Sequence, residues 1–130
     1  MVQTQLESIY LKVARKKAVN LVVCDRGLLD GAAYYSGVTK NFLQFNNTSL
    51  EKIYKRYDAV IWLETLVKID KNKSIEIRNL DKKDISLALK ISNNNLENWR
   101  SHHNFYKVKS SSIGDKKKSI INIINDLLTN

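Results

Sequence analysis

Apolar residues recur every three or four positions over three long stretches of the chain, which is the spacing of helices with one buried stripe. These stretches predict helices over residues 3–17, 85–99 and 115–128. Asp81, with Asp84 three residues later, resembles a capping box ahead of the second of them. In the first helix the side chains expected to be buried are Leu6, Ile9, Tyr10, Val13 and Ala14.

Shorter helical pieces are expected between the first two long helices. Residues 28–35 and 39–45 have helical patterns that are separated at Gly37. The hydroxyl of Thr48 or Ser49 can accept an unpaired backbone N–H, which predicts the start of a further helix that extends to residue 57.

Three short runs have the character of β-strands. Residues 19–24 and 59–63 are almost continuously apolar and rich in β-branched side chains, as in parallel strands that are covered on both faces. Residues 105–108 stand where a third strand is expected, and alternation over 74–78 suggests a small additional strand. Because helices and strands alternate, we predict a three-layer α/β domain in which helices flank a parallel sheet and the first two runs are neighbouring strands.

Length and composition fit one folded domain. A chain of 130 residues has material for a single core, and 43% hydrophobic with 27% charged residues is ordinary globular usage. No apolar run approaches the roughly 18 residues that span a bilayer, and the single cysteine, Cys24, permits neither an internal disulfide nor a multi-cysteine metal site. We therefore expect one domain over residues 1–130, without a membrane span, in the cytoplasm.

The chain is strongly basic, with 22 Lys and Arg against 13 Asp and Glu and a net charge of +9. Such a charge can attract nucleic acid, an anionic membrane or phosphorylated ligands. The basic residues are 17 Lys and 5 Arg, whereas proteins that read nucleic acid favour Arg for bidentate contacts. Nucleic acid is therefore not the expected partner.

Two residues with chemical potential follow the first predicted strand. Asp25 and Arg26 stand at its carboxyl end, which in open α/β sheets is where ligands bind. A carboxylate there can orient a metal-bound water or accept a proton, and a guanidinium can bind a phosphate through two hydrogen bonds. The alternative is structural, with Asp25 capping the next helix and Arg26 pairing with a nearby acid.

Other candidate residues have structural interpretations. The adjacent His102 and His103 have diverging side chains and no further ligand at metal-binding spacing, so we predict no metal site and interpret them as a cationic pair at a helix end. Trp62 and Trp99 fall within apolar patterns and are expected in the core.

An ordered set of residues resembles the P-loop AAA/nucleotide-kinase-like domain of NadR-type kinases and TRPL translocation defect proteins. The similarity runs over most of the chain and implies a P-loop NTPase fold. The residues that carry it are Gln3, Gln5, Leu6 and Glu7, then Cys24-Asp25-Arg26-Gly27, Leu29-Asp30 and Tyr34, then Tyr57 to Leu63 and, more weakly, Arg78, Ala88, Trp99, His102 and Val108.

The sequence departs from this family at the loop that binds the nucleotide. Members carry a glycine-rich loop ending in Gly-Lys-Ser or Gly-Lys-Thr that cradles phosphates, and no glycine of this sequence is followed by such a pair. The chain is therefore expected to correspond to the C-terminal two-thirds of such a domain, N-terminally incomplete through truncation or degeneration.

The resemblance also implies a reaction. It implies phosphoryl transfer from ATP or GTP with Mg²⁺ to a small phosphate-acceptor substrate, and, if a missing segment supplied the phosphate loop, Asp25 would be the catalytic residue that orients the metal or acts as general base. Arg26 would contact substrate or phosphate, and Arg78 would be a lid residue. Without the glycine-rich loop, we expect the chain to bind nucleotide with at best millimolar affinity and to be inactive.

A function of another class is also open from the sequence. The chain can be a non-catalytic interaction module whose sheet edge and basic surface bind a protein partner, RNA or anionic lipid. The sequence does not choose between these partners.

Overall fold

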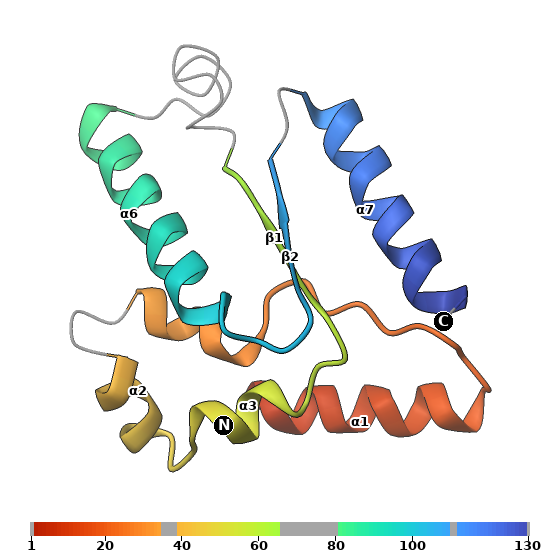
Figure 1. Ribbon diagram of the computed structural model, residues 1–130. Coiled ribbons are helices and arrows are strands. Elements are labelled where there is room, and N and C mark those ends of the chain that lie inside the picture. The colour runs from red at the N-terminus through yellow and green to blue at the C-terminus, as the bar shows by residue number, and fades with distance from the viewer. Residues whose placement is uncertain (1, 35–38, 66–80, 110–111, 130) are drawn as a thin grey trace.

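The computed structural model describes residues 2–34, 39–65, 81–109 and 112–129, most of which are helical (Figure 1). Two of the helices, at opposite ends of the chain, are among the longest elements. In chain order the elements are α1 (Val2–Lys16), the 3₁₀-helix η1 (Leu28–Ala33), α2 (Thr39–Phe45), α3 (Leu50–Tyr54), β1 (Val60–Leu63), α6 (Lys82–Trp99), β2 (Phe105–Val108) and α7 (Ile113–Thr129).

Capping side chains begin two of the helices where the sequence predicts them. The hydroxyl of Ser49 accepts a hydrogen bond from the backbone N–H of Lys52 at the start of α3, and the Asp81 carboxylate does the same for Asp84 at the start of α6. The helix after Ser49 ends at Tyr54 and not at residue 57, because the chain tightens there into i→i+3 hydrogen bonds.

β1 and β2 form a two-stranded parallel sheet. Val60 is opposite Phe105 and Leu63 is opposite Val108. The chain passes through α6 between the two strands, and α6 packs against β1, where Trp62 Nε1 donates a hydrogen bond to the backbone oxygen of Ser92. The predicted parallel relation of residues 59–63 and 105–108 is therefore confirmed.

The predicted three-layer parallel sheet is wrong. Residues 19–24 form neither helix nor strand, and among the described residues no backbone hydrogen bond joins residues 20–25 to another segment. Leu21, Val22 and Val23 are 40–70% exposed. An apolar, β-branched run has the composition of a covered strand, but it becomes a strand only where a neighbouring edge pairs with its backbone. The additional strand predicted over 74–78 lies outside the described residues.

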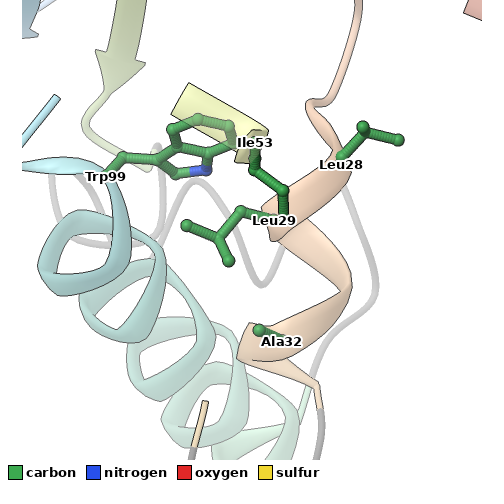
Figure 2. Packing of buried hydrophobic residues seen from close by; sticks show 5 residues of the cluster. All are labelled: Leu28, Leu29, Ala32, Ile53 and Trp99. Atoms are coloured by element: carbon green, nitrogen blue, oxygen red, sulfur yellow. The ribbon is translucent and has the colours of Figure 1, made fainter. Parts of the chain in front are cut away.

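The core lies where η1, α3 and the end of α6 meet. Figure 2 shows the Trp99 indole beside Ile53 and Leu29. Leu29 and Ile53 are fully buried, and Trp62 is also buried, so both tryptophans lie in the interior as predicted. A Cβ on Gly27 would lie 2.6 Å from the Trp99 ring, so the chain needs glycine where it passes over the indole. The buried cluster comprises Leu28, Leu29, Ala32, Ile53 and Trp99.

The two terminal helices contribute little to this core. Neither α1 nor α7 contains a buried residue. The inward side of α7 is only half-buried, and α7 contacts β2. No helix in the described parts of the chain is both long enough and apolar enough to cross a membrane.

Candidate functional site

The turn at Asp25 and Arg26 links residues 19–24 to η1, and both side chains are exposed. Arg26 has a backbone φ of 79° and donates a hydrogen bond from its guanidinium to the Tyr34 hydroxyl at 3.2 Å. Asp25 does not cap the following helix. That position belongs to Gly27, whose N–H donates to the Asp30 carboxylate at 3.3 Å. Asp30, the third residue of η1, therefore supports the start of the helix by accepting the N–H of Gly27, which differs from the N-cap role predicted as the alternative for Asp25.

Of the three residues predicted to act in catalysis, the structure describes Asp25 and Arg26. Asp25 and Arg26 are adjacent at the surface, and Arg78 lies outside the described residues. Catalysis requires groups held in fixed positions where water is excluded, and the exposed turn does not offer this. The roles given to these residues stay predictions. A shallow surface depression of about 300 Å³ lies elsewhere, lined by Gln44, Asn47, Thr48, Ser49 and Lys52.

The glycines that the structure describes do not form a cradle for nucleotide phosphates. Gly27 and Gly31 lie against aromatic rings, with a Cβ at Gly31 placed 2.9 Å from Phe42. Gly114 lies inside the first turn of α7. These residues therefore do not offer the phosphate cradle that ATP or GTP with Mg²⁺ would need. Across the described ranges, no three His, Cys, Asp or Glu side chains are grouped so that they could share a metal ion.

His102 has a structural role and is not part of a cationic pair, so that interpretation is wrong. The side chain is buried, and its Nε2 lies 3.1 Å from the Tyr54 carbonyl and 2.9 Å from the Tyr57 carbonyl. Its Nδ1 accepts the backbone N–H of Asn104 at 3.0 Å. A ring that accepts at Nδ1 and donates at Nε2 is the neutral tautomer. His102 therefore joins the end of α3 to the turn before β2.

A carboxylate is half-buried beside the core. Asp30 accepts the indole N–H of Trp99 at 2.6 Å as well as the N–H of Gly27. Burial raises the pKa of Asp30 above its usual value, and the two hydrogen bonds, together with the charge of Arg26, oppose that rise.

The raised pKa of Asp30 predicts a pH dependence of stability. An acid whose pKa is higher in the folded state stabilises the fold when it is protonated, so this contribution is present below the unfolded pKa and lost as pH rises through the folded value. In the wild type the free energy of unfolding, measured in urea at successive pH values, should therefore fall as pH rises through the folded pKa of Asp30. In Asp30→Asn this fall should be absent. Asp25→Asn is the exposed control and should retain it. Equal pH profiles for Asp30→Asn and the wild type would contradict the prediction.

The exposed turn should be insensitive to loss of Asp25. We expect Asp25→Ala to leave the urea midpoint unchanged, because the side chain is exposed and does not cap η1. Arg26→Gly should raise stability by up to about 1 kcal/mol, since a left-handed backbone strains a residue with a Cβ. A clear loss in Asp25→Ala would mean that the carboxylate supports the fold after all.

Helix α1 is attached to the rest of the protein by its polar side. The Glu7 carboxylate accepts hydrogen bonds from the Tyr57 hydroxyl at 2.9 Å and from the Arg56 guanidinium at 3.2 Å. Arg56 also donates to the Thr4 carbonyl at 3.4 Å, and Gln3 donates to the Arg26 carbonyl at 3.2 Å. The half-buried residues of α1 are Gln3, Thr4, Glu7, Ser8, Leu11 and Ala14.

The same polar contacts extend into the body of the protein. The Tyr57 hydroxyl accepts the backbone N–H of Leu28 at 2.8 Å, and burial raises the pKa of Tyr57. Burial and the nearby charge of Glu7 also raise the pKa of the Cys24 thiol. A raised pKa disfavours the thiolate form of the exposed Cys24.

The apolar side of α1 faces outward. Its large side chains are 44–72% exposed, so the prediction that this stripe is buried is wrong except at the half-buried Ala14. Helical spacing predicted the stripe correctly, but it could not reveal that Glu7 and Arg56 turn the opposite side inward. In Figure 1, α1 lies along one side of the protein. We define the outward face of α1 as Val2, Leu6, Ile9, Tyr10 and Val13.

No family model, curated protein or solved structure matches this chain. Together with the two-stranded sheet, this result corrects the resemblance to a P-loop AAA/nucleotide-kinase-like domain: the similarity of short motifs did not identify the family. The outward face of α1 is therefore the candidate functional site that rests on the structure.

Proposed function

We propose that the protein is a non-catalytic interaction module that binds a protein partner through the outward face of α1. The observation that carries this proposal is the orientation of the helix. Its polar side is fixed against the body by Glu7, Arg56 and Tyr57, and its apolar side is exposed. This arrangement suits binding and provides no catalytic group.

The size and continuity of the apolar face support this function. Leu6, Ile9, Tyr10 and Val13 follow the i, i+3, i+4, i+7 spacing, so they form one ridge on the helix. Full burial of such a side chain contributes about 1.5–3 kcal/mol. Exposed apolar patches on soluble proteins commonly mark interaction sites. A ridge of this kind matches the mode in which a helix binds in an apolar groove of its partner.

The attachment of α1 supports binding in a second way. The contacts of Glu7 with Arg56 and Tyr57 hold α1 against the rest of the protein, so the apolar ridge is already formed before a partner binds. A surface that is ordered in advance loses less conformational entropy on binding. The proposed face is therefore preorganised.

Residues 19–23, which follow α1, favour a protein over a lipid surface. They expose apolar side chains, and their backbone groups have few partners among the described residues. Unpaired backbone groups are costly in hydrocarbon, whereas a polypeptide can supply hydrogen bonds to them.

The proposal can be tested by photo-crosslinking the full chain in the cells that produce it. Benzoylphenylalanine would replace Ile9, and at a control position it would replace Leu87, an exposed apolar residue of α6. We expect a discrete adduct with another protein from position 9 only. Leu6→Asp on the same face should reduce its yield about tenfold or more, as loss of a central contact does.

Two results would overturn the proposed function. One is the absence of a protein adduct at position 9, and the other is an adduct whose yield is unaffected by Leu6→Asp. Circular dichroism of each variant distinguishes loss of binding from loss of folding, because unfolding of α1 would remove the helical signal of 15 residues.

A further inference from the structure

We infer that the partner is acidic and presents to α1 an apolar surface rimmed by Asp and Glu side chains. This inference rests on the proposed function, and it adds the chemistry of the partner. It follows from the charges that surround the outward face of α1 and from the absence of exposed acidic groups within that helix.

All the exposed charges of α1 and the turn after it are basic. Lys12, Arg15, Lys16 and Lys17 are exposed, and among the described residues none of them forms an ion pair. The acidic residue of α1, Glu7, faces inward and is paired with Arg56. A partner therefore meets positive charge and no negative charge on this helix.

The positions of two lysines link this charge to the apolar ridge. Lys12 follows Ile9 by three residues, and Lys16 follows Val13 by three, so each lysine is a neighbour of the ridge on the helix surface. The helix dipole favours basic residues in the last turn, which accounts for Arg15 and Lys16. It does not account for Lys12, which precedes that turn. Lys12 and Lys16 form a basic border beside the ridge.

Charge also distinguishes the candidate occupants. A second copy of the chain would bring the same uncompensated cations to a symmetric contact, and each copy has a net charge of +9. Electrostatic complementarity sets both the rate and the specificity of association. The like charges of two copies of the chain therefore oppose their association. An acidic protein satisfies the basic border and the apolar ridge together.

The first experiment reverses the basic border in the crosslinking assay. Lys12→Glu combined with Lys16→Glu should reduce the adduct from position 9 by about tenfold or more. The control is Lys82→Glu with Lys83→Glu, an equal charge change on two exposed residues of α6, which should leave the adduct within about twofold.

The assay distinguishes failure of the proposed function from failure of the inference that the partner is acidic. If Leu6→Asp abolishes the adduct while Lys12→Glu with Lys16→Glu leaves it unchanged, the acidic partner is wrong and the proposed function stands. If no variant of the outward face changes the adduct, both fail. If the α1 and α6 charge reversals reduce the adduct yield equally, the net charge of the protein and not the basic border controls binding, and the inference is overturned.

A second experiment uses defined probes with the purified full chain. One synthetic amphipathic helix combines Leu with Glu, and a matched helix replaces Glu with Lys. We expect binding of the Glu helix only, weakening as NaCl rises from about 0.05 M to 0.5 M because salt screens exposed charges. The inference would be overturned by equal binding of both helices, by tighter binding to phosphatidylcholine–phosphatidylserine vesicles, or by sedimentation showing self-association that Leu6→Asp removes.

Discussion

Trp99→Ala is expected to lower the free energy of unfolding by about 3–5 kcal/mol, the loss that follows removal of a buried tryptophan. The indole is 4% exposed and packs beside Leu29 and Ile53 in the main cluster. It also stacks on Tyr54 at a centroid distance of 5.8 Å and donates its N–H to Asp30. Alanine would leave a cavity and remove a hydrogen bond from a half-buried carboxylate. Urea unfolding followed by circular dichroism measures the loss.

Two further variants separate the causes of this loss. Trp99→Phe keeps an aromatic ring but removes the N–H that bonds to Asp30, so its effect should be intermediate. Leu87→Ala changes an exposed residue of the same helix and should have little effect. If Trp99→Ala costs no more than Leu87→Ala, the cluster around Trp99 is not the centre of stability.

Local elements of this fold could be predicted because their signals are local. The cap at Ser49 needs only its own hydroxyl and the N–H three residues later, and the same holds for Asp81. The burial of Trp99 also follows from the apolar stripe of its helix. These features do not depend on contacts between distant segments of the chain.

The tertiary arrangement could not be predicted because residues far apart in the sequence determine it. Residues 19–24 have the composition of a buried strand, but no pattern in the run specifies an edge to pair with. The sequence pattern identified the apolar stripe of α1 but did not show that this stripe faces outward. That direction depends on hydrogen bonds from Arg56 and Tyr57, about 50 residues away, to a carboxylate that an amphipathic pattern counts as polar surface.

The candidate site was missed for the same reason. The motif of Asp25 and Arg26 drew attention because an acid and a base followed an apolar run, although the described structure leaves both side chains at the surface. The basic residues of α1 appeared in the sequence as part of a general excess of lysine. They gain meaning only once the adjoining apolar ridge is known to be exposed.

Arg56→Ala is expected to release α1 from the body of the protein, with a loss of about 2–4 kcal/mol, because it leaves the Glu7 carboxylate without its cation. The side chains of Arg56 and Glu7 are 27% and 12% exposed, so the pair is shielded from water far more than an ordinary surface pair. Arg56 also holds the Thr4 carbonyl. Hydrogen exchange should show α1 amides losing protection while amides near Trp99 keep theirs.

The matched control for this variant is Arg100→Ala. Arg100 pairs with Glu97 at 2.9 Å, but both side chains are more than half exposed, so this pair should contribute little. Release of α1 also removes the preorganisation on which the proposed interaction depends. Arg56→Ala should therefore reduce the adduct formed at Ile9 although it alters no residue of the outward face, whereas Arg100→Ala should not. Retained protection of α1 in Arg56→Ala would show that other contacts hold the helix.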